Sequence, residues 1–241
     1  MTIEKIIKTI SVPNNQIKIM KSGESVYNDW QKLKEKLTSS EIVDIAQQIS
    51  RSTIEENKKG NYILPKTSQQ ILTAIKDGRM QVIVGRDNDN NVRFLVAAGY
   101  VSLGKDENSK NIVEIGTLIR NSEVSTKHTE GDDKDFISPI YNKGWLSEFK
   151  PSTRILAAVI YSIMQNFCEV TVIATSRSDK SMAALVEAGF KDEKWTKALK
   201  NNSCDSDCLG VTDYQNCPFA DEEFDNSQNN TSGCKLMVLA N

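Results

Sequence analysis

Apolar residues recur along this chain in two spacings, one typical of helices and one typical of buried strands. Two threonines, Thr38 and Thr67, are each followed three residues later by Glu or Gln, the capping-box pattern of a helix start. Behind each of them apolar residues repeat every three or four positions, whereas short continuous apolar runs between polar turns indicate strands. The predicted helices are 24–37, those beginning at Thr38 and at Thr67, 152–167 and one ending near Gly189; the predicted strands are 80–85, 92–103, 112–119, 170–175 and 235–239.

Three consecutive elements, 112–119, 152–167 and 170–175, form a strand–helix–strand unit. Two buried strands joined by a crossover helix must lie parallel, because a tight hairpin cannot connect them. The earlier strands 80–85 and 92–103 are instead joined by a polar turn and form an antiparallel hairpin. The sequence therefore predicts an α/β fold whose mixed, mostly antiparallel sheet has a central parallel pair flanked by helices.

Three runs in this region, VEIGTL, VIATS and MAALVEAGF, resemble the GNAT superfamily of N-acyltransferases, which use acyl-CoA. The resemblance covers residues 41–191 and the last strand. It implies the GNAT-type acyl-CoA N-acyltransferase fold and transfer of an acetyl group from acetyl-CoA to a primary amine of a small molecule or protein. The chain then divides into an N-terminal helical extension (1–40), a GNAT-like core (41–200), a cysteine-rich insertion (201–233) and a final core strand (234–241).

Amine acylation by a thioester needs a deprotonated amine, a stabilised oxyanion and a departing thiolate, all held in line. The resemblance places Glu114 where several family members have a glutamate that acts as general base. A carboxylate in a partly buried strand suits that role if burial raises its pKa; its structural alternatives are a polar residue on a half-exposed strand face and an ion pair at the sheet edge. The family often has a tyrosine that protonates the thiolate where this chain has Leu185. That role is therefore either vacant or filled by Tyr141 in the long connection 121–151.

The contacts expected for the acyl donor lie on the same unit. By the resemblance, the strand backbone at Thr117, Leu118 and Ile119 would bind the pantetheine arm. Ser178 lies where the family often has an asparagine that contacts the cofactor. Gly116 suits a β-bulge that splays the two parallel strands and admits that arm, although a glycine in a strand can also simply accommodate packing.

The start of the crossover helix is the expected phosphate site, since a helix N-terminus offers free N–H groups and a partial positive charge. Pro151 suits the first turn, and Ser152 or Thr153 can cap it. The family's glycine-rich pyrophosphate loop is replaced here by LSEFKPSTR, which has no glycine, so Lys150 and Arg154 would supply the charge for a diphosphate. The alternative is an ordinary capped helix that binds nothing.

The missing glycines keep two further functions open. One is a non-catalytic binding module on the GNAT fold that has lost CoA. The other is an acyltransferase whose donor is acyl carrier protein, because phosphopantetheine lacks the adenosine diphosphate portion that the glycine-rich loop binds.

Four of the five cysteines, Cys204, Cys208, Cys217 and Cys234, fall in one late segment. Four thiolates so close together in a cytosolic chain predict one structural zinc ion with tetrahedral coordination. Disulfides, or free thiols packed in a small lobe, are the alternatives. Cys168, just after the crossover helix, is expected to be a small buried hydrophobic residue.

Composition excludes several other classes of protein. The chain has 241 residues, of which 39% are hydrophobic and 26% charged, which is typical of a globular protein. A net charge of −2 gives no general attraction to nucleic acid or anionic membrane. No stretch approaches the ~20 apolar residues of a membrane helix, and the first residues lack the apolar segment of a signal peptide, so a cytoplasmic location is expected. The predicted partners are acyl-CoA and an amine acceptor.

Overall fold

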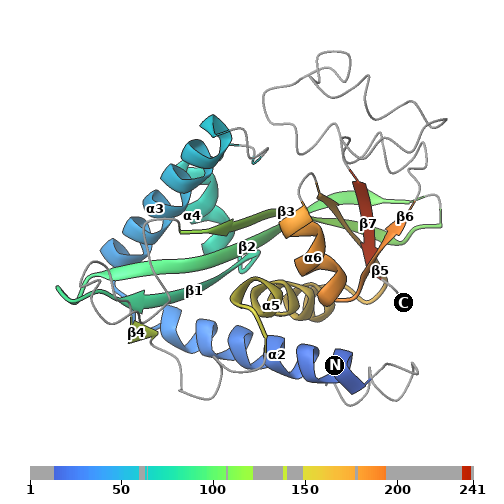
Figure 1. Cartoon of the computed structure of the whole chain (residues 1–241), viewed down its shortest axis with the longest axis horizontal. Coiled ribbons are helices and arrows are strands. Elements are labelled where there is room, and N and C mark those ends of the chain that lie inside the picture. The colour runs from blue at the N-terminus through green and yellow to red at the C-terminus, as the bar shows by residue number, and fades with distance from the viewer. Residues whose placement is uncertain are drawn as a thin grey trace.

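The computed structural model describes residues 14–59, 63, 65–106, 108–121, 138–139, 149–176, 179–193 and 235–239. A mixed sheet lies between two groups of helices, with α3 and α4 on one face and α2 and α5 on the other (Figure 1). The helices are α2 (Asn14–Lys34), α3 (Ser39–Lys58), α4 (Ser68–Lys76), α5 (Pro151–Asn166) and α6 (Asp179–Glu187). The strands are β1 (Met80–Arg86), β2 (Val92–Lys105), β3 (Asn111–Arg120), β4 (Ser138–Pro139), β5 (Val170–Ser176), β6 (Phe190–Glu193) and β7 (Lys235–Leu239).

Within the described residues the sheet has seven strands, in the order β4-β1-β2-β3-β5-β7-β6. Strands β3 and β5 pair in parallel, and every other neighbouring pair is antiparallel. The predicted α/β class, with a mixed sheet and one central parallel pair, is therefore confirmed. The last strand, β7, inserts between β5 and β6, so it holds the outer half of the sheet together (Figure 1).

Both predicted capping boxes are present. The Glu41 N–H donates to Thr38 Oγ1 at 3.2 Å while the Thr38 N–H donates to Glu41 Oε2 at 2.8 Å. Thr67 and Gln70 make the same reciprocal pair at the start of α4. Each capping box satisfies two backbone N–H groups at a helix start and contributes about 1 kcal/mol to stability.

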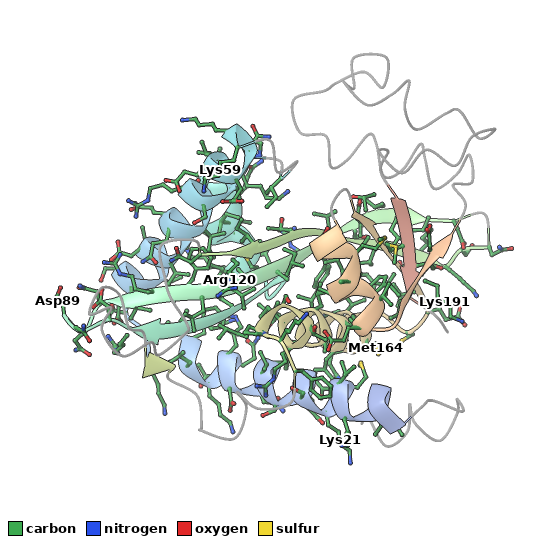
Figure 2. All side chains as sticks on the ribbon, in the orientation of Figure 1. Lys21, Lys59, Asp89, Arg120, Met164 and Lys191 are labelled. Carbon is green, nitrogen blue, oxygen red and sulfur yellow. The ribbon has the colours of Figure 1, made fainter. Side chains whose placement is uncertain are left out.

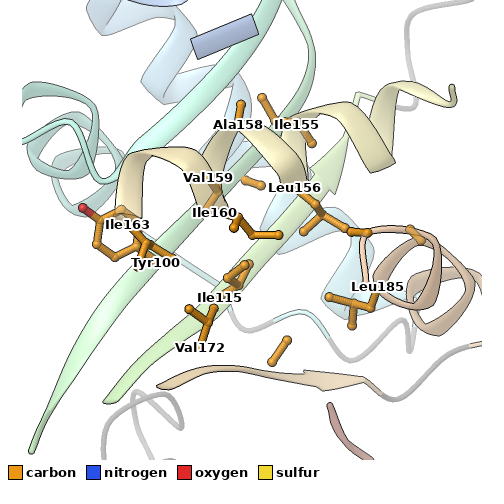
Figure 3. Packing of buried hydrophobic residues seen from close by; sticks show 14 of the residues in the cluster. Tyr100, Ile115, Ile155, Leu156, Ala158, Val159, Ile160, Ile163, Val172 and Leu185 are labelled. Atoms are coloured by element: carbon orange, nitrogen blue, oxygen red, sulfur yellow. The ribbon is translucent and has the colours of Figure 1, made fainter. Parts of the chain in front are cut away.

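One hydrophobic cluster lies between α5 and the sheet; we call it the α5 cluster. Figure 3 shows α5 lying across the strands, with Ile115 and Val172 of the parallel pair beneath it. The α5 side chains that it buries completely include Ile155, Leu156, Val159, Ile160 and Ile163. This broad apolar face matches the one predicted for the crossover helix.

A second cluster, the α3 cluster, lies on the other face of the sheet. It packs Ile45 and Ile49 of α3 and Ile75 of α4 against β1 and β2, including Phe94. The α3 cluster covers this face along β1 and β2, whereas the parallel pair has a smaller buried group there, Ile112 and Ile173. Both faces of the parallel pair therefore carry buried apolar residues.

Helix α2 packs closely against α5. It begins at Asn14, ten residues before the predicted start at Glu24, and it contains a glycine in its interior. That glycine, Gly23, meets the backbone of Ala157, and a Cβ added to it would lie 2.4 Å from the Ala157 carbonyl carbon. Val26 of α2 belongs to the α5 cluster, so this helix shares the core, and the division at residue 40 stays a prediction.

Candidate functional site

The two parallel strands pair over only part of their length. Their ladder runs from Asn111–Val170 to Ile115–Ala174. Beyond it β5 continues beside β7, while β3 continues beside β2 to the exposed Arg120 (Figure 2). In the part of the chain that the structure describes, no strand pairs with the β5 side of β3 after Ile115. The parallel pair therefore opens at its carboxyl end.

A β-bulge in β3 lies where the strands part. In the register with β2, Glu114 is opposite Val101 and Thr117 is opposite Gly99, so two residues of β3 face a single residue of β2. Gly116 is one of those two residues. The bulge predicted at this glycine is therefore present.

The bulge reverses which face of the sheet each β3 side chain reaches. Before it, Val113 and Ile115 belong to the α5 cluster. After it, Ile119 belongs to the α3 cluster, while Leu118 packs on the α5 cluster. The two groups of β3 residues expected at the site, Glu114 and the run 117–119, thus lie on either side of a change in strand twist.

Glu114 is completely buried. Its Oε1 accepts a hydrogen bond of 3.1 Å from the Thr175 hydroxyl on β5. Its register partners in the neighbouring strands, Val101 and Ile173, are apolar. Burying a carboxylate is costly unless hydrogen bonds replace its water, and Thr175 supplies one of them. A buried carboxylate at the last positions of the parallel ladder is well placed to take a proton from a group bound in the opening.

The three residues after the bulge are largely enclosed. Thr117 and Ile119 are buried, and Leu118 is partly buried. They belong to the segment of β3 that lies beyond the ladder with β5. An extended ligand chain could therefore add to this strand through backbone hydrogen bonds.

The start of α5 differs from the prediction. Lys150 is the N-cap residue, with extended backbone angles, and Pro151 takes the first helical position. The expectation that Ser152 or Thr153 caps the helix was wrong, since the residue before a proline is held extended and so marks the boundary. Lys150 is exposed and, among the described residues, it makes no side-chain capping bond. The first turn of α5 therefore keeps backbone N–H groups that suit an anion.

Two side chains expected at the phosphates are turned toward neighbouring helices. The Thr153 hydroxyl donates to the Glu187 carboxylate on α6. Arg154 Nε donates to Ser22 Oγ on α2 at 2.6 Å, and only 6% of the Arg154 side chain is exposed. Burial lowers the pKa of Arg154 to about 10, against the opposing effect of Asp29. Arg154 stays charged at neutral pH, and its hydrogen bond to Ser22 joins α5 to α2.

Several predicted residues carry no structural description. Tyr141, Ser178 and the cysteines Cys204, Cys208, Cys217 and Cys234 lie outside the described residues. The described residues contain no group of three or more potential metal ligands, so zinc stays a prediction. Leu185 is buried in the α5 cluster. Cys168 is exposed, so the expectation that it is buried was wrong: it follows the end of α5, in the turn before β5.

Sequence reasoning missed Thr175. The signal that could have found it is the parallel register, in which Glu114 is opposite Ile173. Side chains two residues apart on a strand share a face, so Thr175 lies on the same face as Glu114, one step toward the opening.

The chain gives no match to a known protein family, to a characterised protein or to a solved structure. The resemblance to N-acyltransferases therefore rests on the three sequence runs alone. Among the described helices, none has the length and apolar character needed to cross a membrane.

Proposed function

We propose that this protein is an N-acyltransferase that moves an acetyl or other acyl group from acyl-CoA to a primary amine. The observation that carries the proposal is the position of Glu114, a buried carboxylate where β3 and β5 part. A crossover helix runs antiparallel to the strands it joins, so the N-terminus of α5 lies at the same end as the opening. A base and an anion site at one opening suit a phosphate-bearing thioester and an amine.

The proposed reaction assigns a role to each of these features. The acyl donor lies along β3 from Thr117 to Ile119, with its thioester near the bulge. Glu114, directly or through water, accepts a proton from the acceptor's ammonium group. The freed nitrogen attacks the thioester carbonyl carbon; the C–N bond forms, the C–S bond breaks, and the thiolate takes up the proton that the amide nitrogen loses. Because Leu185 stands where the family often has a tyrosine, Tyr141 is the candidate in this chain for delivering that last proton.

One observation favours a second donor, acyl carrier protein. Thr153 contacts Glu187, Arg154 contacts Ser22, and the run 146–154 at the start of α5 has no glycine. The diphosphate of CoA would then meet mainly Lys150 and the backbone of the first turn of α5. A phosphopantetheine carried on a protein has no adenosine diphosphate portion, so its binding does not depend on a glycine-rich pyrophosphate loop. The chemistry at Glu114 is the same for both donors.

Calorimetric titration with acetyl-CoA, with CoA and with acetylated acyl carrier protein tests the proposal. Binding of one donor, followed by amide formation with a mixture of primary amines, is the expected result. Lack of binding by all three at millimolar concentration would leave the non-catalytic module as the better account. Binding of the carrier protein alone would replace CoA as the donor and keep the reaction.

A further inference from the structure

We infer that Thr175 is a positioning residue that orients the carboxylate of Glu114 for proton transfer. The inference rests on the proposed function and adds a residue that the sequence resemblance does not supply. Its basis is the 3.1 Å hydrogen bond from Thr175 Oγ1 to Glu114 Oε1, which links the two strands near the end of their ladder.

The surroundings of this bond hold it in one geometry. Thr175 is β-branched, so its first side-chain torsion is stiff. The strand that carries it is paired on its other side, where Thr175 is opposite Leu236 of β7. Glu114 is held from the other direction by β2, opposite Val101. A donor fixed on β5 and an acceptor fixed on β3 define the direction of the carboxylate.

Glu114 and Thr175 differ in their exposure to solvent, and we assign them different roles. Glu114 is fully buried, whereas Thr175 is half-buried at the opening. A hydroxyl that donates to a carboxylate stabilises its charged form and leaves it able to accept a proton. Thr175 therefore acts on the reaction through Glu114, and its loss should affect turnover more than donor binding.

Three substitutions on β5 isolate the hydroxyl. Thr175→Val keeps the shape and branching but removes the donor, and Thr175→Ser keeps the donor. Thr171→Val is the matched control, since Thr171 is a half-buried threonine on the same strand and face, opposite Ile112. With an acyl donor and acceptor in steady state, Thr175→Val should lower kcat by about tenfold, the equivalent of one lost hydrogen bond to a charged group.

The other variants and constants complete the pattern. In Thr175→Val the KM for the acyl donor should stay within about twofold of the wild-type value, because the substitution removes no contact with the bound donor. Thr175→Ser should keep most of the wild-type kcat, and Thr171→Val should equal the wild type. A Thr175→Val enzyme with wild-type kcat, or a serine variant as slow as the valine variant, would overturn the inference.

A second readout does not depend on catalysis. The pH at which Glu114 titrates can be followed by NMR of carboxyl-labelled glutamate, with Glu114→Gln assigning the signal. Removing the hydroxyl should move that midpoint upward by about one pH unit in Thr175→Val, and not in Thr171→Val. An unmoved midpoint overturns the inference in an active or an inactive protein. A moved midpoint in a chain that transfers no acyl group supports the coupling of Thr175 to Glu114 and refutes the proposed function.

Discussion

Substituting Gly23 by alanine should destabilise the protein, although alanine is the better helix former. An added Cβ would lie 2.4 Å from the Ala157 carbonyl carbon and 2.6 Å from its oxygen, both closer than real Cβ contacts. The neighbouring atoms belong to backbone, so α2 and α5 must separate by about 1 Å to restore ordinary contact. That separation also stretches the bond from Arg154 to Ser22.

The expected cost follows from three effects. Overpacking of the new Cβ against Ala157 costs ~1–3 kcal/mol. Weakening the hydrogen bond from the charged Arg154 to Ser22 costs at most ~1.5–3 kcal/mol. Alanine returns about 1 kcal/mol of helix propensity. We therefore expect Gly23→Ala to lower the free energy of unfolding by about 2–4 kcal/mol, which for a chain of this size lowers Tm by roughly 5–15 °C.

Urea unfolding followed by far-ultraviolet circular dichroism measures this change. Ser25→Ala is the control, since Ser25 is exposed on the same helix and its substitution should change stability by less than about 0.5 kcal/mol. Lys21, which points away from α5, marks the same outer side of α2 (Figure 2). A Gly23→Ala protein as stable as the wild type would refute the close packing of α2 on α5.

Two further predictions concern charge and metal. Lys150→Ala should raise the Kd for acetyl-CoA by about three- to tenfold at low salt and by less at high salt. Arg154→Met should leave that Kd within about twofold of the wild-type value, because Arg154 is held by Ser22. A larger loss of affinity in Arg154→Met than in Lys150→Ala, measured by calorimetric titration, would place Arg154 at the phosphates. Elemental analysis of protein purified without added metal should find one zinc ion per chain, and the Cys208→Ser variant should contain none. A metal-free wild type with four titratable thiols would exclude the zinc site.

Much of the fold follows from local sequence signals. The capping boxes at Thr38 and Thr67 form as predicted, because each is satisfied by residues three positions away. The parallel pairing of β3 with β5 also follows, since a long connection through a helix permits little else. The bulge at Gly116 follows from a glycine inside a strand.

The features that were missed depend on contacts between distant segments. Helix α2 starts ten residues before the predicted Glu24, and the close approach of Gly23 to Ala157 appears only in the folded chain. The direction of Arg154 is set by Ser22, which lies far away in the sequence. Thr175 becomes part of the site only through the register of β3 with β5. Spacing along a single sequence carries no signal for such pairs.

The most direct test of the account is the turnover of Glu114→Gln. Glutamine keeps the size of the side chain and can still accept a hydrogen bond from Thr175, but it cannot take a proton. With an acyl donor that the wild type uses, the variant should bind the donor with nearly unchanged Kd and turn over ~10²–10⁴-fold more slowly, the usual span for general acid–base catalysis. Wild-type turnover by Glu114→Gln across the pH range would contradict the assignment of Glu114 as the base.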